Sequence, residues 1–130
     1  NQGLYSPVQA SSRIYSSQDI ERWHINEMKS LLSRFSGVKF IFDNVKQKYY
    51  PVLRDAMTSF RSKNEGKPLV VIDDTPFIDF DILDYPVNDI EEIFLLKGSD
   101  AAIWGPKASN GIIVIITQRG KSTKIEQKEE

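Results

Sequence analysis

The chain has 130 residues, with seventeen Lys or Arg, eighteen Asp or Glu, no Cys and a formal net charge of −1. This length fits one domain, and the absence of cysteine excludes disulfides, thiolate catalysis and cysteine-bound zinc or iron–sulfur sites. The basic residues are scattered among acids, which argues against a surface that follows nucleic-acid phosphates.

Charge is divided unevenly along the chain. Residues 1–66 hold ten Lys or Arg against six Asp or Glu, and residues 67–130 hold seven against twelve. The two halves are therefore expected to attract each other or to show opposite faces to different partners. The longest apolar run, Ile112–Ile116, has five residues, whereas a membrane-spanning helix needs about twenty, so no segment is expected to span a bilayer as a helix.

The first predicted elements are a strand and two helices. Arg13–Tyr15 is compatible with a short strand. A helix is predicted over Ser17–Trp23, with Ser16 as its N-cap and an acidic residue three positions after the cap. Asn26 is predicted to cap a second helix. Its apolar residues recur at helical spacing, and a glycine is predicted to end it (Met28, Leu31, Leu32 and Phe35; Gly37).

A pair of strands is predicted next. Val38–Phe42 alternates enough to be a strand and ends at the turn-forming Asp43-Asn44. Lys48–Leu53 is predicted to be a second strand, and Pro51 makes it an edge strand or a bulge because proline lacks a ladder donor. Asp55–Lys63 is compatible with a short helix or a loop.

Three apolar runs dominate the second half, each stopped by turn residues. The pattern predicts a strand, a tight turn and a short returning strand, at Leu69–Asp73, Asp74–Pro76 and Phe77–Ile78. Helical turns are expected on either side of Pro86, at Phe80–Leu83 and Val87–Ile90. A strand, a helical turn broken by Gly105-Pro106, and the last strand follow, at Glu92–Lys97, Ser99–Trp104 and Ile112–Gln118.

These elements favour an α+β fold, a small mixed β-sheet with short packed helices. The expected organisation is a flexible lead-in over 1–12, one domain over 13–120 and a disordered charged tail over 121–130.

The second half contains a motif of apolar, turn-forming, acidic and small residues in a fixed order. Its fifteen residues are Pro68, Leu69, Ile72, Asp73, Pro76, Asp89, Ile90, Glu91, Lys97, Gly98, Ala101, Gly105, Asn110, Gly111 and Thr117. The pattern resembles the plug domain of TonB-dependent outer-membrane receptors, and within that group the large nutrient transporters of the Bacteroidetes. Ser17–Ile20 and Leu31–Val38 fit more loosely upstream. One departure is Asp73-Asp74, where the family usually has Asp-Gly.

The resemblance implies a gate and not an enzyme, placed at the outer membrane or the periplasmic side of the cell envelope. The implied partners are an outer-membrane β-barrel (in its own chain or absent), the energy-transducing TonB protein and a surface lipoprotein; no nucleic acid or cofactor is implied, and the ligand is unknown. The chain starts without Met and stops ten residues after Gly120. It is therefore expected to be a gate separated from its barrel or, alternatively, a barrel-less binding module ending a larger envelope protein.

Other chemistry was weighed from the residues. The acidic cluster at Asp73, Asp74, Asp79, Asp81 and Asp84 suggests calcium, but the calcium-loop pattern is absent and a solvated loop is favoured. No catalytic, cofactor-binding or metal site is predicted. A small hydrolase is disfavoured because no nucleophile is recognisable near His24, the single histidine, and no serine lies in a nucleophile-elbow sequence. Four aromatic residues are candidate partner contacts, or simply cap the core: Phe77, Phe80, Tyr85 and Trp104. Tyr49–Lys63, with the poorest local signals, is the segment expected to move first.

Overall fold

The computed structural model describes residues 13–53 and 66–119, which form a five-stranded mixed sheet and a separate hairpin. The sheet has the strand order β1-β6-β7-β4-β5, in which β4 and β7 are parallel and the other neighbours antiparallel. Its strands are β1 (Tyr15–Ser16), β4 (Leu69–Ile72), β5 (Thr75–Phe77), β6 (Ile90–Leu96) and β7 (Ile112–Thr117). The hairpin consists of β2 (Val38–Asp43) and β3 (Lys48–Leu53).

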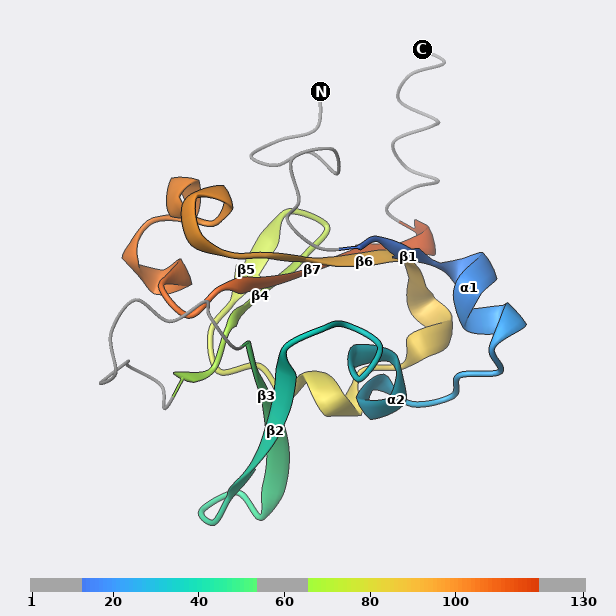
Figure 1. The fold of residues 1–130 in the computed structure, drawn as a ribbon, viewed down its shortest axis with the longest axis horizontal. Coiled ribbons are helices and arrows are strands. Elements are labelled where there is room, and N and C mark those ends of the chain that lie inside the picture. Colours follow the sequence, from blue (N-terminus) through green and yellow to red (C-terminus); the bar gives the residue numbers. More distant parts are fainter. Residues whose placement is uncertain (1–12, 54–65, 120–130) are drawn as a thin grey trace.

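Short helical elements cover both faces of the sheet (Figure 1). On one side lie α2 (Met28–Leu32), the hairpin and two 3-10 turns, η3 (Ile82–Asp84) and η4 (Val87–Asp89), and α1 (Ser17–Arg22) follows β1 at the sheet's end. On the other side lie three 3-10 turns, η5 (Gly98–Asp100), η6 (Ala102–Trp104) and η7 (Pro106–Ala108). The α+β fold class predicted from the sequence is confirmed.

Strand alternation divides the core into two clusters, because successive side chains point to opposite faces of a sheet. The helix-side cluster contains Ile20, Met28, Leu31, Leu32, Phe35, Leu53, Ile93, Leu95, Ile113 and Ile115, among others. The turn-side cluster consists of Leu69, Val71, Phe94, Leu96, Ala101, Trp104, Ala108, Ile112 and Val114. Since β4, β6 and β7 are buried on both faces, they read in the sequence as continuous apolar runs.

Helix α1 agrees with its prediction. Ser16 is the N-cap and forms a reciprocal capping box with Asp19, so two of the amide groups left over at the helix start have side-chain acceptors. The helix ends at Arg22, one residue before the predicted end, and Trp23 is its C-cap.

Helix α2 is shorter than predicted. The predicted apolar stripe is buried, but the N-cap is Glu27, which makes no side-chain cap hydrogen bond, so the Asn26 cap was wrong. The helix stops at Leu32, where the Ser33 hydroxyl donates to the carbonyl oxygen of Lys29 and the next amides turn to i−3 acceptors. Gly37, with a φ of 85°, serves the turn into β2 and not the helix end.

The turn after β4 lies one residue earlier than predicted. Asp73 and Asp74 form a two-residue turn with φ values of 49° and 73°, and β5 starts at Thr75 and includes Pro76. Two positive φ values give the hairpin turn whose twist matches the strands, and aspartate tolerates them. The proline is tolerated because β5 is the edge of the sheet.

The remaining elements lie within a few residues of their predictions. Pro51 stands in β3 opposite Phe40, and among the described residues β3 pairs with β2 alone, as expected of an edge strand. The predicted segment Asp55–Lys63, the lead-in and the charged tail lie outside the described residues. Within the described ranges, no helix combines the length and the apolar character that crossing a membrane requires.

Candidate functional site

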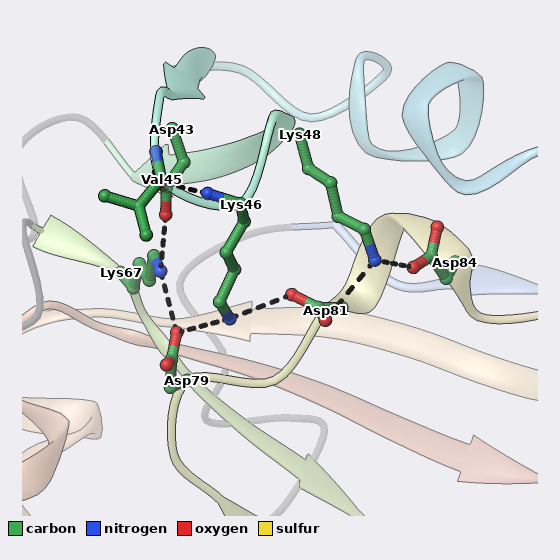
Figure 2. A network of polar contacts seen from close by, with 8 residues as sticks. All are labelled: Asp43, Val45, Lys46, Lys48, Lys67, Asp79, Asp81 and Asp84. Atoms are coloured by element: carbon green, nitrogen blue, oxygen red, sulfur yellow. Dashed lines mark hydrogen bonds and ion pairs between the residues drawn. The ribbon is translucent and has the colours of Figure 1, made fainter.

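A network of three lysines and four aspartates joins the hairpin to the segment after β5 (Figure 2). Asp43 ends β2, Lys46 lies in the hairpin turn, Lys48 begins β3 and Lys67 precedes β4. The remaining members follow β5 and include the end of η3: Asp79, Asp81 and Asp84. We call these seven residues the lysine–aspartate network. Through Lys46 and Lys48 it joins the basic first half to aspartates of the acidic second half, which is one of the two arrangements expected from the charges.

Lys67 is the most enclosed cation of the lysine–aspartate network, with a side chain that is 13% exposed. Its Nζ lies 2.7 Å from Asp79 Oδ1, 3.4 Å from Asp43 Oδ2 and 4.8 Å from the centre of the Tyr50 ring. Burial works to lower the pKa of Lys67, but its hydrogen bonds and charge contacts with Asp79 and Asp43 outweigh burial, so the pKa is raised.

The hairpin lysines reach the same segment from the other side. Lys46 Nζ lies 3.2 Å from both Asp79 Oδ1 and Asp81 Oδ1, and Lys48 Nζ lies 2.6 Å from Asp84 Oδ2 and 3.5 Å from Asp81 Oδ2. The hydrogen bond from Lys67 is the main reason why the pKa of Asp79 is lowered. For Asp81, burial opposes the shift, and the contacts with Lys46 and then Lys48 lower the pKa. The carboxylates of Asp79 and Asp81 are therefore held ionised.

The hairpin turn is shaped by Asp43. Its Oδ1 accepts hydrogen bonds from the backbone N–H groups of Val45 (2.9 Å) and Lys46 (3.2 Å), which is an Asx turn. These two bonds, that of Lys46 first, lower the pKa of Asp43 together with the contact to Lys67. Asp43 thus both closes the turn and aims Lys46 at its partners.

The acidic cluster predicted from the sequence is split into two groups. Asp73 and Asp74 form the turn after β4, whereas Asp79, Asp81 and Asp84 belong to the lysine–aspartate network. Within residues 13–53 and 66–119, no three His, Asp or Glu side chains are arranged to hold a metal ion.

The family-motif residues stand mostly at strand ends and turns. Asp73 accepts from the Thr117 backbone N–H (2.9 Å) and from its hydroxyl (2.5 Å), and the Asn110 amide donates to the Lys67 carbonyl oxygen (3.2 Å). Asp89 accepts from the Tyr85 hydroxyl (2.6 Å) and Glu91 from Ser17 (3.4 Å). Three motif glycines have positive φ: Gly98, Gly105 and Gly111.

The other motif residues lie in or beside the sheet. Pro68, Leu69, Ile90 and Ala101 are buried, Ile72 and Lys97 are half-buried, and Pro76 stands in β5. Leu69 donates its backbone N–H to the carbonyl oxygen of Gly111 (3.0 Å), which extends the parallel pairing of β4 with β7. The motif therefore marks the frame of the sheet, and its roles beyond that stay predictions.

Three of the four candidate contact aromatics gather in one row. The ring centroids of Phe77 and Phe80 are 5.3 Å apart, and those of Phe80 and Tyr85 are 6.2 Å apart. Trp104 is 8% exposed and belongs to the turn-side cluster, which fits the alternative that these rings cap the core. The Tyr85 phenol has a raised pKa, first because it is buried and then because it donates to Asp89.

An open pocket of about 250 Å³ lies between the hairpin, α2 and η3. It is lined by Glu27, Lys29, Lys48, Tyr49, Asp81, Leu83 and Asp84. Lys29 stacks on the hairpin here, with its Nζ 4.7 Å from the ring centre of Tyr49 and 5.5 Å from that of Phe40. The pocket is thus bordered by the same charges that bind the hairpin to the body.

Sequence reasoning from motifs missed the three lysines of the network. Their spacing follows no known motif, since they come from a turn, a strand start and a linker into β4. The signal that pointed toward Lys46 and Lys48 was the excess of basic residues before residue 67 and of acidic residues after it; no such signal pointed toward Lys67.

Comparisons with known proteins agree with the fold. A family model described as the TonB-dependent receptor plug domain matches residues 6–112. The structure is similar to the siderophore receptor PirA from Acinetobacter baumannii, with a TM-score of 0.67 and 19% identity over 91% of this chain and 19% of that chain.

Two further solved structures are similar. A variant of the ferric enterobactin receptor PfeA from Pseudomonas aeruginosa gives a TM-score of 0.63 at 18% identity, covering 87% of this chain and 18% of that one. The RagAB peptide importer gives 0.61 at 21% identity, covering 87% and 12%. The chain therefore spans less than a fifth of the length of each of these proteins.

Proposed function

The chain belongs to the family of TonB-dependent receptor plug domains, and from this premise we propose that it gates nutrient uptake through an outer-membrane receptor by a non-covalent change of conformation. The observation that carries the proposal is the family match over residues 6–112, together with a two-faced sheet of the same architecture as the receptors PirA and PfeA. We include in it the Bacteroidetes transporter type suggested by the sequence motif.

The proposed mechanism uses no catalytic residue. A sheet packed on both faces is a rigid body that can close a pore, and uptake requires that part of it give way when a partner pulls. The proposed partners are a surrounding β-barrel and the energy-transducing TonB protein. A surface lipoprotein is a further proposed partner. The proposed domain spans 13–120, between a lead-in and a charged tail.

The proposed partner contacts are the three aromatic rings that form one row, Phe77, Phe80 and Tyr85. The row ends at Phe77, which is exposed to solvent. Phe77 is 38% exposed and the neighbouring Ile78 58% exposed. Aromatic side chains supply contact area at a low entropy cost. Trp104 stays in this proposal with a smaller role, because most of its ring faces the turn-side cluster.

The alternative function is a barrel-less binding module of a larger envelope protein. It is favoured by the exposed apolar side chains on the hairpin, because a surface of this kind suits a protein partner. This reading uses the same fold and differs in what surrounds it.

The test is made on the parent protein as its source produces it. A gate is expected in the outer-membrane fraction, in a protein tens of kilodaltons larger than this chain, whose gel mobility changes on boiling. Deleting residues 13–120 from that protein should then leave a barrel that admits small hydrophilic molecules without energy. A parent without heat-modifiable mobility, in a soluble or lipid-anchored form, would support the binding module instead.

A further inference from the structure

Among the described residues, buried apolar contacts anchor the hairpin β2–β3 to the body at its base. Leu53 and Val52 are buried and Phe40 packs against the helix-side cluster. In the outer half the apolar side chains are exposed: Ile41 by 41%, Phe42 by 41%, Val45 by 92% and Tyr49 by 49%. Apolar burial therefore stabilises the base of the hairpin and contributes little at its tip.

Polar contacts hold the outer half in place. Lys46 and Lys48 make four ion pairs with the segment 79–84, at 2.6 to 3.5 Å, and Asp43 makes one with Lys67. The side chains of Lys46, Lys48, Asp79, Asp81 and Asp84 are between 33% and 63% exposed, so salt screens most of these pairs. Figure 2 shows the side chains of Lys46 and Lys48 reaching from the hairpin to the aspartates of the segment 79–84.

The acidic segment has its own connection to the body. Lys67, which precedes β4, binds Asp79 at 2.7 Å and is itself mostly enclosed. When the ion pairs of Lys46 and Lys48 with this segment break, the pair of Lys67 with Asp79 remains on the body. The ion pairs of the network thus divide into the exposed pairs of Lys46 and Lys48, which move with the hairpin tip, and the pairs of Lys67 with Asp79 and Asp43, which stay.

We propose that the tip of the hairpin, residues 44–49, is an electrostatic clasp that opens away from the segment 79–84 as ionic strength rises, while both buried clusters and the enclosed pair of Asp43 with Lys67 stay in place. The screening length falls from about 10 Å at 0.1 M salt to about 3 Å at 1 M, which is comparable with the lengths of the pairs. The hairpin pivots at its buried base, and an isolated two-stranded hairpin has little stability of its own.

This inference goes beyond the proposed gating, since the clasp is a property of the domain whether or not a barrel encloses it. Opening would uncover the carboxylates of Asp81 and Asp84, widen the pocket beside Tyr49 and give a partner access to both. The clasp also identifies the part of the described structure that separates at the lowest cost.

The experiment measures distances in the 130-residue chain by spin labels. The chain has no cysteine, so label pairs can be introduced at chosen exposed positions. One pair, V45C with I78C, spans the clasp, and a second, N88C with I103C, spans the body as a reference. Raising NaCl from 0.02 M to 1 M should shift the clasp pair to longer distances with a broader distribution and leave the body pair unchanged.

Charge variants separate the network from general salt effects. The double variant Lys46→Gln with Lys48→Gln should show the long, broad distribution already at 0.02 M NaCl. Lys39→Gln, a matched control in β2 of the same hairpin but outside the network, should behave as the parent chain. Exchanging the charges in Lys48→Asp with Asp84→Lys should restore more of the short distance than Lys48→Asp alone.

Each outcome decides the proposal. An unchanged clasp distance at 1 M NaCl and in the double variant would overturn it, because apolar packing would then hold the tip. Simultaneous broadening of both label pairs would also overturn it, since the domain would be opening as a single unit. These results leave the gating proposal untouched, because that depends on the parent protein's barrel and permeability.

Discussion

At the scale of single residues, Asp73 has a backbone role and a side-chain role that a substitution can separate. It turns the chain at a φ of 49°, donates its backbone N–H to Ile115 at 3.0 Å, and accepts from Thr117 through both carboxylate oxygens. Its neighbour Asp74 shares the positive φ, at 73°, and is exposed. The two aspartates therefore differ in side-chain bonding and share a backbone requirement.

The first prediction compares Asp73→Ala with Asp74→Ala in urea unfolding. Both variants place alanine at positive φ, which costs a similar amount, but Asp73→Ala also removes the carboxylate that accepts from the backbone N–H and the hydroxyl of the buried Thr117. We expect Asp73→Ala to lose about 1.5–3 kcal/mol more of the free energy of unfolding than Asp74→Ala. Equal losses would mean that the turn conformation alone makes the first position important.

Sequence reasoning at this scale found the residues whose partners are local. Ser16 and Asp19 are three positions apart, so their capping box is visible in the sequence. The partners of Lys67 are Asp43 and Asp79, which lie 24 and 12 positions away, and only the folded chain brings them together. For Trp104 the sequence left open partner contact and core capping, because the choice depends on η6 lying against the sheet.

At the scale of elements, helix α1 shows how a charge controls a helix start. The Ser16 backbone N–H bonded to Asp19 is the main cause of the lowered pKa of this carboxyl; burial opposes it, and Arg22 lowers the pKa further. The carboxylate is thus favoured over its protonated form while the helix is folded.

The second prediction is a loss of this contribution in acid. The pKa of Asp19 in the folded chain lies below 3.8, so its contribution to stability is complete above that pH and disappears as the pH falls through the folded value. The difference in the free energy of unfolding between the parent and Asp19→Asn should therefore shrink from pH 5 to pH 2.5. Taking the difference cancels the titration of other acids, and a difference that stays constant with pH would contradict the prediction.

Helices and strands were predicted correctly from the sequence where their burial produces a recognisable pattern of apolar residues. The strands β4, β6 and β7 are buried on both faces and appear as apolar runs, and the stripe of α2 appears at helical spacing. The end of α2 was missed because Ser33 bonds back to Lys29, which competes with continuing the helix. The turn after β4 was misplaced because Pro76 was taken as a turn residue, although an edge strand accepts it.

At the scale of the whole molecule, the sheet is shared by two clusters on opposite faces. Phe94 and Leu95 are neighbours in β6, both fully buried, and belong to different clusters. Neither cluster can lose its packing without exposing the strands that support the other. The body is therefore expected to unfold as one unit, whereas the clasp of the hairpin opens separately.

The last prediction uses the two tryptophans, because one lies on each side of the sheet. Trp23 packs against the helix-side cluster beneath the guanidinium of Arg34, 3.8 Å from its ring centre, and Trp104 belongs to the turn-side cluster. The variants Trp23→Phe and Trp104→Phe each leave one fluorescent reporter. Each unfolding curve in urea should have the same midpoint by fluorescence as by circular dichroism.

Trp104→Phe removes a buried Nε1 that has no hydrogen-bond partner among residues 13–53 and 66–119, but it also removes part of a buried ring, which costs stability. The comparison is therefore made within each variant, between its own fluorescence and circular-dichroism midpoints. If the helix-side reporter in Trp104→Phe changed at a lower urea concentration than circular dichroism, the two faces would be separable. The rigid part of the domain would then be the turn-side face alone, with α2 and the hairpin moving together as a larger unit than the clasp.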